Sequence, residues 1–204
     1  MATTAFLAGA ESGVSKITRV DSWEAFGTTF DSTKLLHVSL RAYFENDGSP
    51  CQIVPVSELA KLPRETILLV AAGQDIASQV TKVCTPETLV FGLLNGPQTE
   101  ITDKDVATLP STSRAASFYP WLTASWTKLS IPPSAIAAAL LTKLDKHTGV
   151  WKSPASTPVK GDLQPIFAVS ETSQRQYQSG KAVNMLRSMK TPGRPHHGIA
   201  YTRC

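Results

Sequence analysis

The chain has 204 residues, of which 42% are hydrophobic and 18% are charged, and these values exclude an extensively disordered protein and fit one folded domain. No apolar run reaches the roughly 18 residues of a transmembrane helix, and the first ten residues lack the basic segment that opens a signal peptide. The three cysteines, Cys51, Cys84 and Cys204, are too widely spaced for a disulfide framework or a zinc motif, so we expect free thiols in a reducing cytoplasm.

The net charge of +4 is unevenly distributed along the chain. Residues 1–104 hold 8 basic and 12 acidic side chains, whereas residues 105–204 hold 12 basic and 4 acidic ones. Two oppositely charged halves fit binding to nucleic acid, or contacts with other copies of the chain or with a charged partner. The basic residues of the second half are dispersed and few aromatic residues interleave with them, which favours a subunit-facing or solvated surface over a nucleic-acid surface.

The first half of the chain alternates between expected strands and expected helices. Ser22 is the expected N-cap of a short aromatic-rich helix over residues 23–30. Apolar residues at helical spacing predict a second helix over residues 35–44, and the turn-forming residues 46–50 end it. A third helix is expected over residues 76–83. Short apolar runs predict strands over residues 3–8, 52–56, 66–72 and 88–94.

In the second half, residues 115–123 predict a strand whose Pro120 places it near a sheet edge or a bulge. Pro132 and Pro133 suit the first turn of an Ala- and Leu-rich helix over residues 135–147. Three prolines then predict an extended surface loop over residues 153–165. A polar helix or loop is expected over residues 171–179, and two further strands are expected over residues 183–189 and 197–201.

This order of elements predicts an α/β fold, namely a single layered domain with a mainly parallel or mixed sheet flanked by helices. No internal repeat, low-complexity tract or linker interrupts the chain. We therefore expect one domain over residues 1–204.

The sequence contains no recognisable catalytic or ligand-binding motif. It has no P-loop, no G-x-G-x-x-G and no G-x-S-x-G nucleophile elbow. His196 and His197 would point to opposite faces of a strand, which makes a poor metal chelate. Asp103 and Asp105 fit the start of a short helix better than a catalytic carboxylate pair. A Ser-His-Asp hydrolase lacks any local signature here, so we expect no catalytic residues, no cofactor, no metal and no enzymatic activity.

Six segments, in order along the chain, resemble the tail sheath proteins of contractile injection systems, which include contractile-tailed phages and R-type bacteriocins. The most specific segment covers residues 131–155, where Pro-Pro-Ser precedes a helix and Gly-Val-Trp-Lys-Ser-Pro-Ala follows it. The other similar segments are residues 4–10, 17–31, 40–56, 117–122 and 179–199.

The resemblance implies a core of subtilisin-like fold that carries none of the protease's catalytic motifs. It implies a structural subunit of a virion tail or phage-like injection particle, assembled in the bacterial cytoplasm, that surrounds an inner tube and contracts by repacking of subunits. The implied partners are copies of itself or a full-length sheath subunit, the inner tail tube protein and the baseplate, without membrane insertion and without nucleic acid.

Members of this family carry an N-terminal arm and a C-terminal domain around the core. We expect residues 1–204 to form the core alone, lacking both. The alternative is a non-polymerising, sheath-associated or regulatory binding module derived from a sheath core.

Head-to-tail contacts that do not close into a ring build helical assemblies of subunits. If the oppositely charged halves of neighbouring subunits meet in this way, charged residues of both halves lie at the interface. The acidic candidates are Glu45, Asp47, Glu58 and Glu65. The basic candidates are Lys143, Lys146, Lys152, Arg187 and Arg194.

Overall fold

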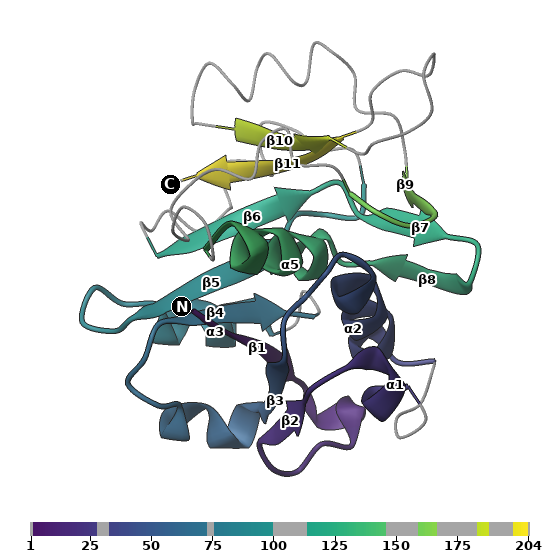
Figure 1. The fold of residues 1–204 in the computed structure, drawn as a ribbon. Helices are drawn as coiled ribbons and strands as arrows, with labels where there is room; N and C mark the ends of the chain where they lie inside the picture. Colours follow the sequence, from purple (N-terminus) through teal and green to yellow (C-terminus); the bar gives the residue numbers. More distant parts are fainter. Residues whose placement is uncertain are drawn as a thin grey trace.

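A computed structural model describes residues 2–27, 33–72, 76–99, 114–145, 159–166, 183–187 and 198–203. Its centre is an eight-stranded sheet in the order β10-β11-β6-β5-β4-β1-β3-β2 (Figure 1). The strands are β1 (Thr3–Ala8), β2 (Thr18–Val20), β3 (Cys51–Pro55), β4 (Ile67–Ala71), β5 (Val90–Asn95), β6 (Ala115–Tyr119), β10 (Val183–Arg187) and β11 (Gly198–Arg203).

The sheet is mixed, with a parallel centre and antiparallel edges. The five strands β3, β1, β4, β5 and β6 run parallel to one another. At one edge β2 runs antiparallel to β3, and at the other β11 and β10 add antiparallel strands beyond β6. The predicted α/β class, with a mainly parallel or mixed sheet flanked by helices, is therefore confirmed.

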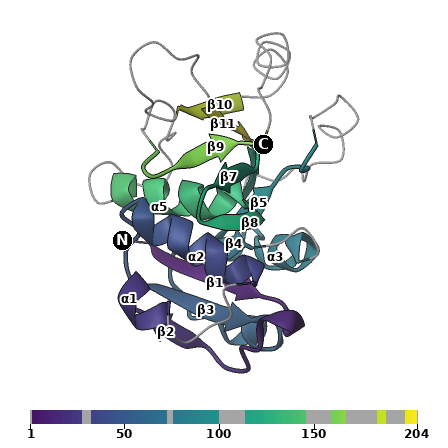
Figure 2. The same cartoon turned by 90° about the vertical axis from the view of Figure 1, so that its right-hand side faces the viewer.

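Helices cover both faces of the sheet, as Figure 2 shows from the side. The helices α1 (Trp23–Phe26), α2 (Leu35–Glu45) and α5 (Pro133–Asp145) lie on one face, and the 3-10 helix η2 (Val56–Lys61) and α3 (Ala77–Val83) lie on the other. A further 3-10 helix, η1 (Ala10–Ser12), follows β1. Because both faces of strand β4 are covered, all of its residues are apolar. Leu68 and Val70 pack into the core on one face, and Ile67 and Leu69 pack into the core on the other.

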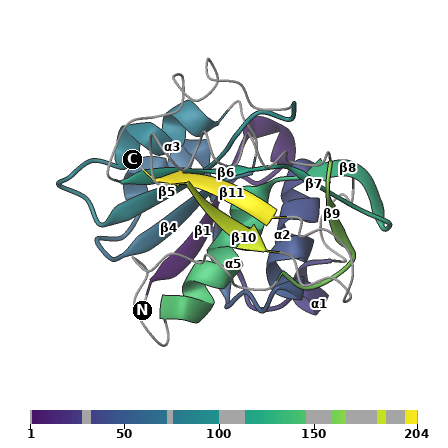
Figure 3. The same ribbon diagram turned by 90° about the horizontal axis from the view of Figure 1, so that it is seen from above.

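Helix α5 is deeply buried over most of its length. Residues 135–139 of this helix are each 0% exposed, because α5 packs against the sheet and also against α2, which lies beside it on the same face (Figure 3). Its N-terminus is fixed by Asn95 at the end of β5. The Asn95 Oδ1 accepts from the Ser134 backbone N–H at 2.9 Å, and its Nδ2 donates to the Ala71 carbonyl at 2.7 Å.

One predicted strand is wrong in extent. Residues 115–123 form two strands in two sheets: β6 lies inside the large sheet, and β7 (Leu122–Ala124) belongs to a three-stranded antiparallel sheet with β8 (Thr127–Ile131) and β9 (Leu163–Pro165). Pro120 lies between the two strands, where no ladder N–H is needed. Trp121 fixes this corner by donating from Nε1 to the Gly96 carbonyl at 2.7 Å.

Most other predicted elements are confirmed with small shifts of their ends. The Ser22 hydroxyl accepts from the Ala25 backbone N–H at 3.3 Å, as its N-cap role requires, although α1 ends at Phe26. The predicted loop over residues 153–165 is wrong at its end, because β9 pairs there with β7. The remaining predicted parts, residues 28–30, 146–147, 153–158, 171–179, 188–189 and 197, lie outside the described residues.

Candidate subunit-contact residues

Asp47 lies in the turn after α2 and joins the two charged halves of the chain within one molecule. Its Oδ2 lies 3.0 Å from Lys143 Nζ on α5 and 2.5 Å from Lys160 Nζ. The hydrogen bonds from Lys160, and then from Lys143, hold the pKa of Asp47 below its usual value. The backbone of Asp47 has φ 65, a left-handed conformation that aspartate tolerates better than most residues.

Glu45 is the last residue of α2, and its carboxylate is held by Arg41 one turn earlier. Arg41 Nε lies 3.0 Å from Glu45 Oε1, and the Arg41 guanidinium lies over the Trp126 ring at 4.0 Å from the ring centroid. These contacts connect α2 to the turn between β7 and β8. The guanidinium is therefore held by an ion pair and a cation–π contact at the same time.

The two remaining acidic candidates lie on the opposite face of the sheet, around η2. Glu58 is paired with Lys61 at 2.8 Å within η2. Glu65 is exposed and makes no ion pair with any residue that the structure describes. Of the acidic candidates, Glu65 is thus the one whose charge remains available to another molecule.

The basic candidates are only partly placed. Lys143 is exposed on α5 and paired with Asp47. Arg187 ends β10, where its backbone pairs with Gly198 of β11. Lys146, Lys152 and Arg194 lie outside the described residues. The structure adds Arg41 and Lys160. The i, i+4 spacing of Arg41 and Glu45 on the predicted helix is a local signal for the first, whereas no local pattern shows that Lys160, before β9, is a neighbour of the turn after α2.

Burial raises the pKa of the Cys51 and Cys84 thiols to about 12, so neither is a ready nucleophile at neutral pH. Within the part of the chain that the structure covers, no group of three or more His, Cys, Asp and Glu side chains could hold a metal ion. No helix in that part is long and apolar enough to cross a membrane.

Comparison with known proteins gives no match to a protein-family model and no match to a curated protein. Solved structures do match. A chain of the sheath complex of the extracellular contractile injection system PVC, in its contracted state, is 33% identical with a TM-score of 0.82, covering 98% of this chain and 59% of that one. A chain of the contracted baseplate of the anti-feeding prophage AFP is 28% identical with a TM-score of 0.75, covering 96% and 64%.

A third match shows the shared fold alone. It is a chain of the AFP helical sheath in its contracted state, 24% identical with a TM-score of 0.71, and it covers 98% of this chain and 61% of that one. The chain thus spans about three fifths of the length of these proteins, and nearly the whole chain takes part in each match.

Proposed function

We propose that this chain, which belongs to the tail sheath family of contractile injection systems, is a structural subunit of a contractile sheath. The observation that carries the proposal is the match to the PVC sheath chain over 98% of this chain. In this proposal the chain assembles with copies of itself, or with a longer sheath subunit, around an inner tube and next to a baseplate, in a particle put together in the bacterial cytoplasm. The work is done by subunit repacking and not by an enzymatic step.

The rigidity of the core supports this role. A subunit that exchanges contacts during contraction must keep its own fold, and closely packed interiors transmit strain without rearranging. Helix α5 is buried against the sheet and against the neighbouring α2, and Asn95 bonds to both its first turn and the end of β4. The subunit therefore suits movement as a single block over the part that the structure describes.

The arrangement of charges supports contacts that can be exchanged. Asp47, Lys143 and Lys160 form a half-exposed ionic cluster, and surface ion pairs of this kind contribute little stability each. A neighbouring subunit that offers a carboxylate to Lys143 therefore replaces one weak pair by another at small free-energy cost. The predicted head-to-tail contacts of the basic candidates would form by such an exchange.

The test is electron microscopy of the purified chain in negative stain over a range of concentrations. We expect ordered rings or tubes, and we expect the double variant Lys146→Glu, Lys152→Glu to assemble more slowly and with a changed salt dependence. The matched control is Lys16→Glu, Lys128→Glu, because both lysines are exposed and lie outside the candidate set. A wild-type chain that stays dispersed at every concentration would instead support the non-polymerising module, and equal assembly by both double variants would remove the basic candidates.

A further inference from the structure

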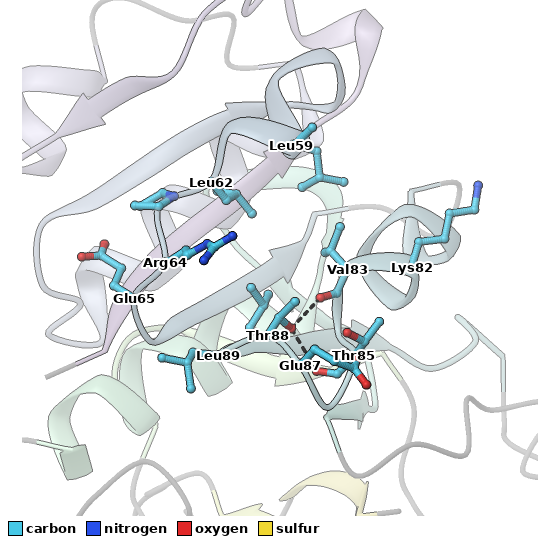
Figure 4. Close-up of a pocket in the computed structure, with 13 residues that line it drawn as sticks. Leu59, Leu62, Arg64, Glu65, Lys82, Val83, Thr85, Glu87, Thr88 and Leu89 are labelled. Atoms are coloured by element: carbon cyan, nitrogen blue, oxygen red, sulfur yellow. Dashed lines mark hydrogen bonds between the residues drawn. The ribbon is translucent and has the colours of Figure 1, made fainter.

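A groove of about 630 Å³ opens between η2 and the turn that joins α3 to β5 (Figure 4). Its floor is apolar and is formed by Leu59, Leu62, Val83 and Val90. Leu59 and Val90 belong to the core on this face of the sheet, while Leu62 and Val83 are only partly buried against it. The groove therefore leaves apolar surface of the η2 and α3 layer open to water.

A cation without a partner among the described residues lies in this groove. The Arg64 side chain extends between Leu62 and Thr88 (Figure 4), and it makes no hydrogen bond or ion pair that involves another described residue. The nearby carboxylate of Glu87 is already engaged, because a hydrogen bond with Thr85 and the charge of Arg114 help to lower its pKa. An apolar floor with a free guanidinium fits a partner that offers an apolar side chain and a carboxylate together.

The lip of the same groove presents that chemistry. Leu89 is 51% exposed and is the one large hydrophobic side chain classed as exposed in the described part of the chain. Glu65, exposed and without an ion pair there, extends to the same side of the groove as Leu89 (Figure 4). Glu65 and Leu89 lie just before the neighbouring strands β4 and β5, whose starts are joined by a hydrogen bond from the Ile67 N–H to the Leu89 carbonyl at 3.0 Å.

A groove and its complementary lip that lie side by side on one molecule allow two copies to contact each other reciprocally through the same patch, as a two-fold interface requires. We propose that two unassembled copies of this chain pair through this surface, with Leu89 of each copy against Leu59, Leu62 and Val83 of the other and Glu65 of each copy opposite Arg64 of the other. The pairing does not depend on the proposed sheath function, because a two-fold contact closes on itself and does not extend into a tube. A contact limited to this groove and its lip involves few residues on each copy, so the pair is weak and reversible.

The experiment is sedimentation equilibrium of the full chain at concentrations from about 1 μM to about 1 mM, which covers weak self-association. We expect a monomer–dimer equilibrium whose dissociation constant rises roughly tenfold or more in Leu89→Ser and in Arg64→Glu, as loss of a central contact does. The swap Arg64→Glu, Glu65→Arg should regain part of the dimer, because both copies then carry the exchanged charges. Lys16→Glu, an exposed change elsewhere, should leave the constant unchanged.

These substitutions are at exposed positions, and thermal unfolding of each variant verifies that it is folded. A wild-type chain that remains monomeric up to the highest concentration overturns the pairing. So does a dimer that Leu89→Ser and Arg64→Glu leave unchanged, since its interface then lies elsewhere. Sheath assembly is read separately as large particles in the microscope, so the failure of one proposal does not decide the other.

Discussion

The side-chain amide of Asn46 binds the backbone of Lys160 through both of its polar atoms. Its Oδ1 accepts from the Lys160 N–H at 2.7 Å, and its Nδ2 lies 3.4 Å from the Lys160 carbonyl while donating to Ala42 at 2.9 Å. Asn46 is 1% exposed, so these bonds are shielded from water. One residue at the end of α2 thereby fixes the chain that leads into β9.

We expect Asn46→Ala to lower the free energy of unfolding by about 1–3 kcal/mol, because it removes both hydrogen bonds to the Lys160 backbone and leaves the Ala42 carbonyl with the backbone N–H of residue 46 alone. Urea denaturation measures the loss. Lys160→Ala is the matched control: it removes the ion pair with Asp47 but keeps the backbone bonds, and we expect a loss below about 1 kcal/mol. Equal losses in the two variants would contradict the role assigned to the Asn46 amide.

The ionic cluster of Asp47 should make stability depend on pH. Because hydrogen bonds from Lys160 and Lys143 lower the folded-state pKa of Asp47 below 3.8, its contribution is present above the unfolded pKa and is lost as the pH falls through the folded pKa. We expect Asp47→Asn to be less stable than the wild type at pH 6 by under about 1 kcal/mol, since the pairs are half exposed. The difference should shrink and then vanish as the pH falls through the lowered folded-state pKa of Asp47.

Asparagine is the right substitution there, because it also tolerates the left-handed backbone of residue 47. Asp47→Ala adds a backbone cost to the loss of charge and should be less stable than Asp47→Asn at every pH. Urea denaturation at several pH values, in low and in 1 M salt, separates the two effects. A wild-type minus Asp47→Asn difference that does not change with pH would rule out the ionic contribution.

Local sequence patterns were sufficient to predict elements that are buried on one face, such as α2, or on both faces, such as β4. The uninterrupted apolar run of β4 and the apolar stripe of α2 predict those elements to within a residue or two at their ends. The three-stranded sheet was not predictable in this way. Its pairing of Thr123 with Gln164 joins distant segments, and the short strands β8 and β9 have no apolar run of their own.

The candidate contact residues show the same limit. The sequence predicts that acidic and basic residues meet, and the structure brings Asp47 and Lys143 together across 96 positions of the chain. Nothing in the charge pattern indicates that this meeting takes place inside one subunit, because it follows from the packing of α2 against α5. Arg64 and Leu89 belong to no charge or hydropathy pattern in the sequence, and only the folded structure shows that both line one groove.

Gly92 in β5 allows α3 to lie close to the sheet. A Cβ at this position would lie 2.7 Å from Val80 Cγ1 and 3.0 Å from Cys84 Sγ, both on the α3 side of β5. We expect Gly92→Ala to cost about 1–3 kcal/mol of stability through overpacking, measured by urea denaturation. The double variant Gly92→Ala, Val80→Ala makes room for the added methyl group and should recover part of the loss relative to Val80→Ala alone. A double variant whose two losses simply add would show that the close approach is not responsible.

The two buried thiols should report on the integrity of the core. Cys51 in β3 and Cys84 after α3 are 1% and 3% exposed, and burial raises the pKa of each to about 12, so at pH 8 both are protonated and shielded in the folded state. In a Cys204→Ser background, we expect a disulfide reagent to label them roughly 100-fold or more slowly than the urea-unfolded chain, because labelling requires local or global opening. Cys84 packs against Gly92, and Gly92→Ala should therefore accelerate labelling at Cys84 more than at Cys51. Rapid labelling of either thiol in the wild type would contradict the packing of its face of the sheet.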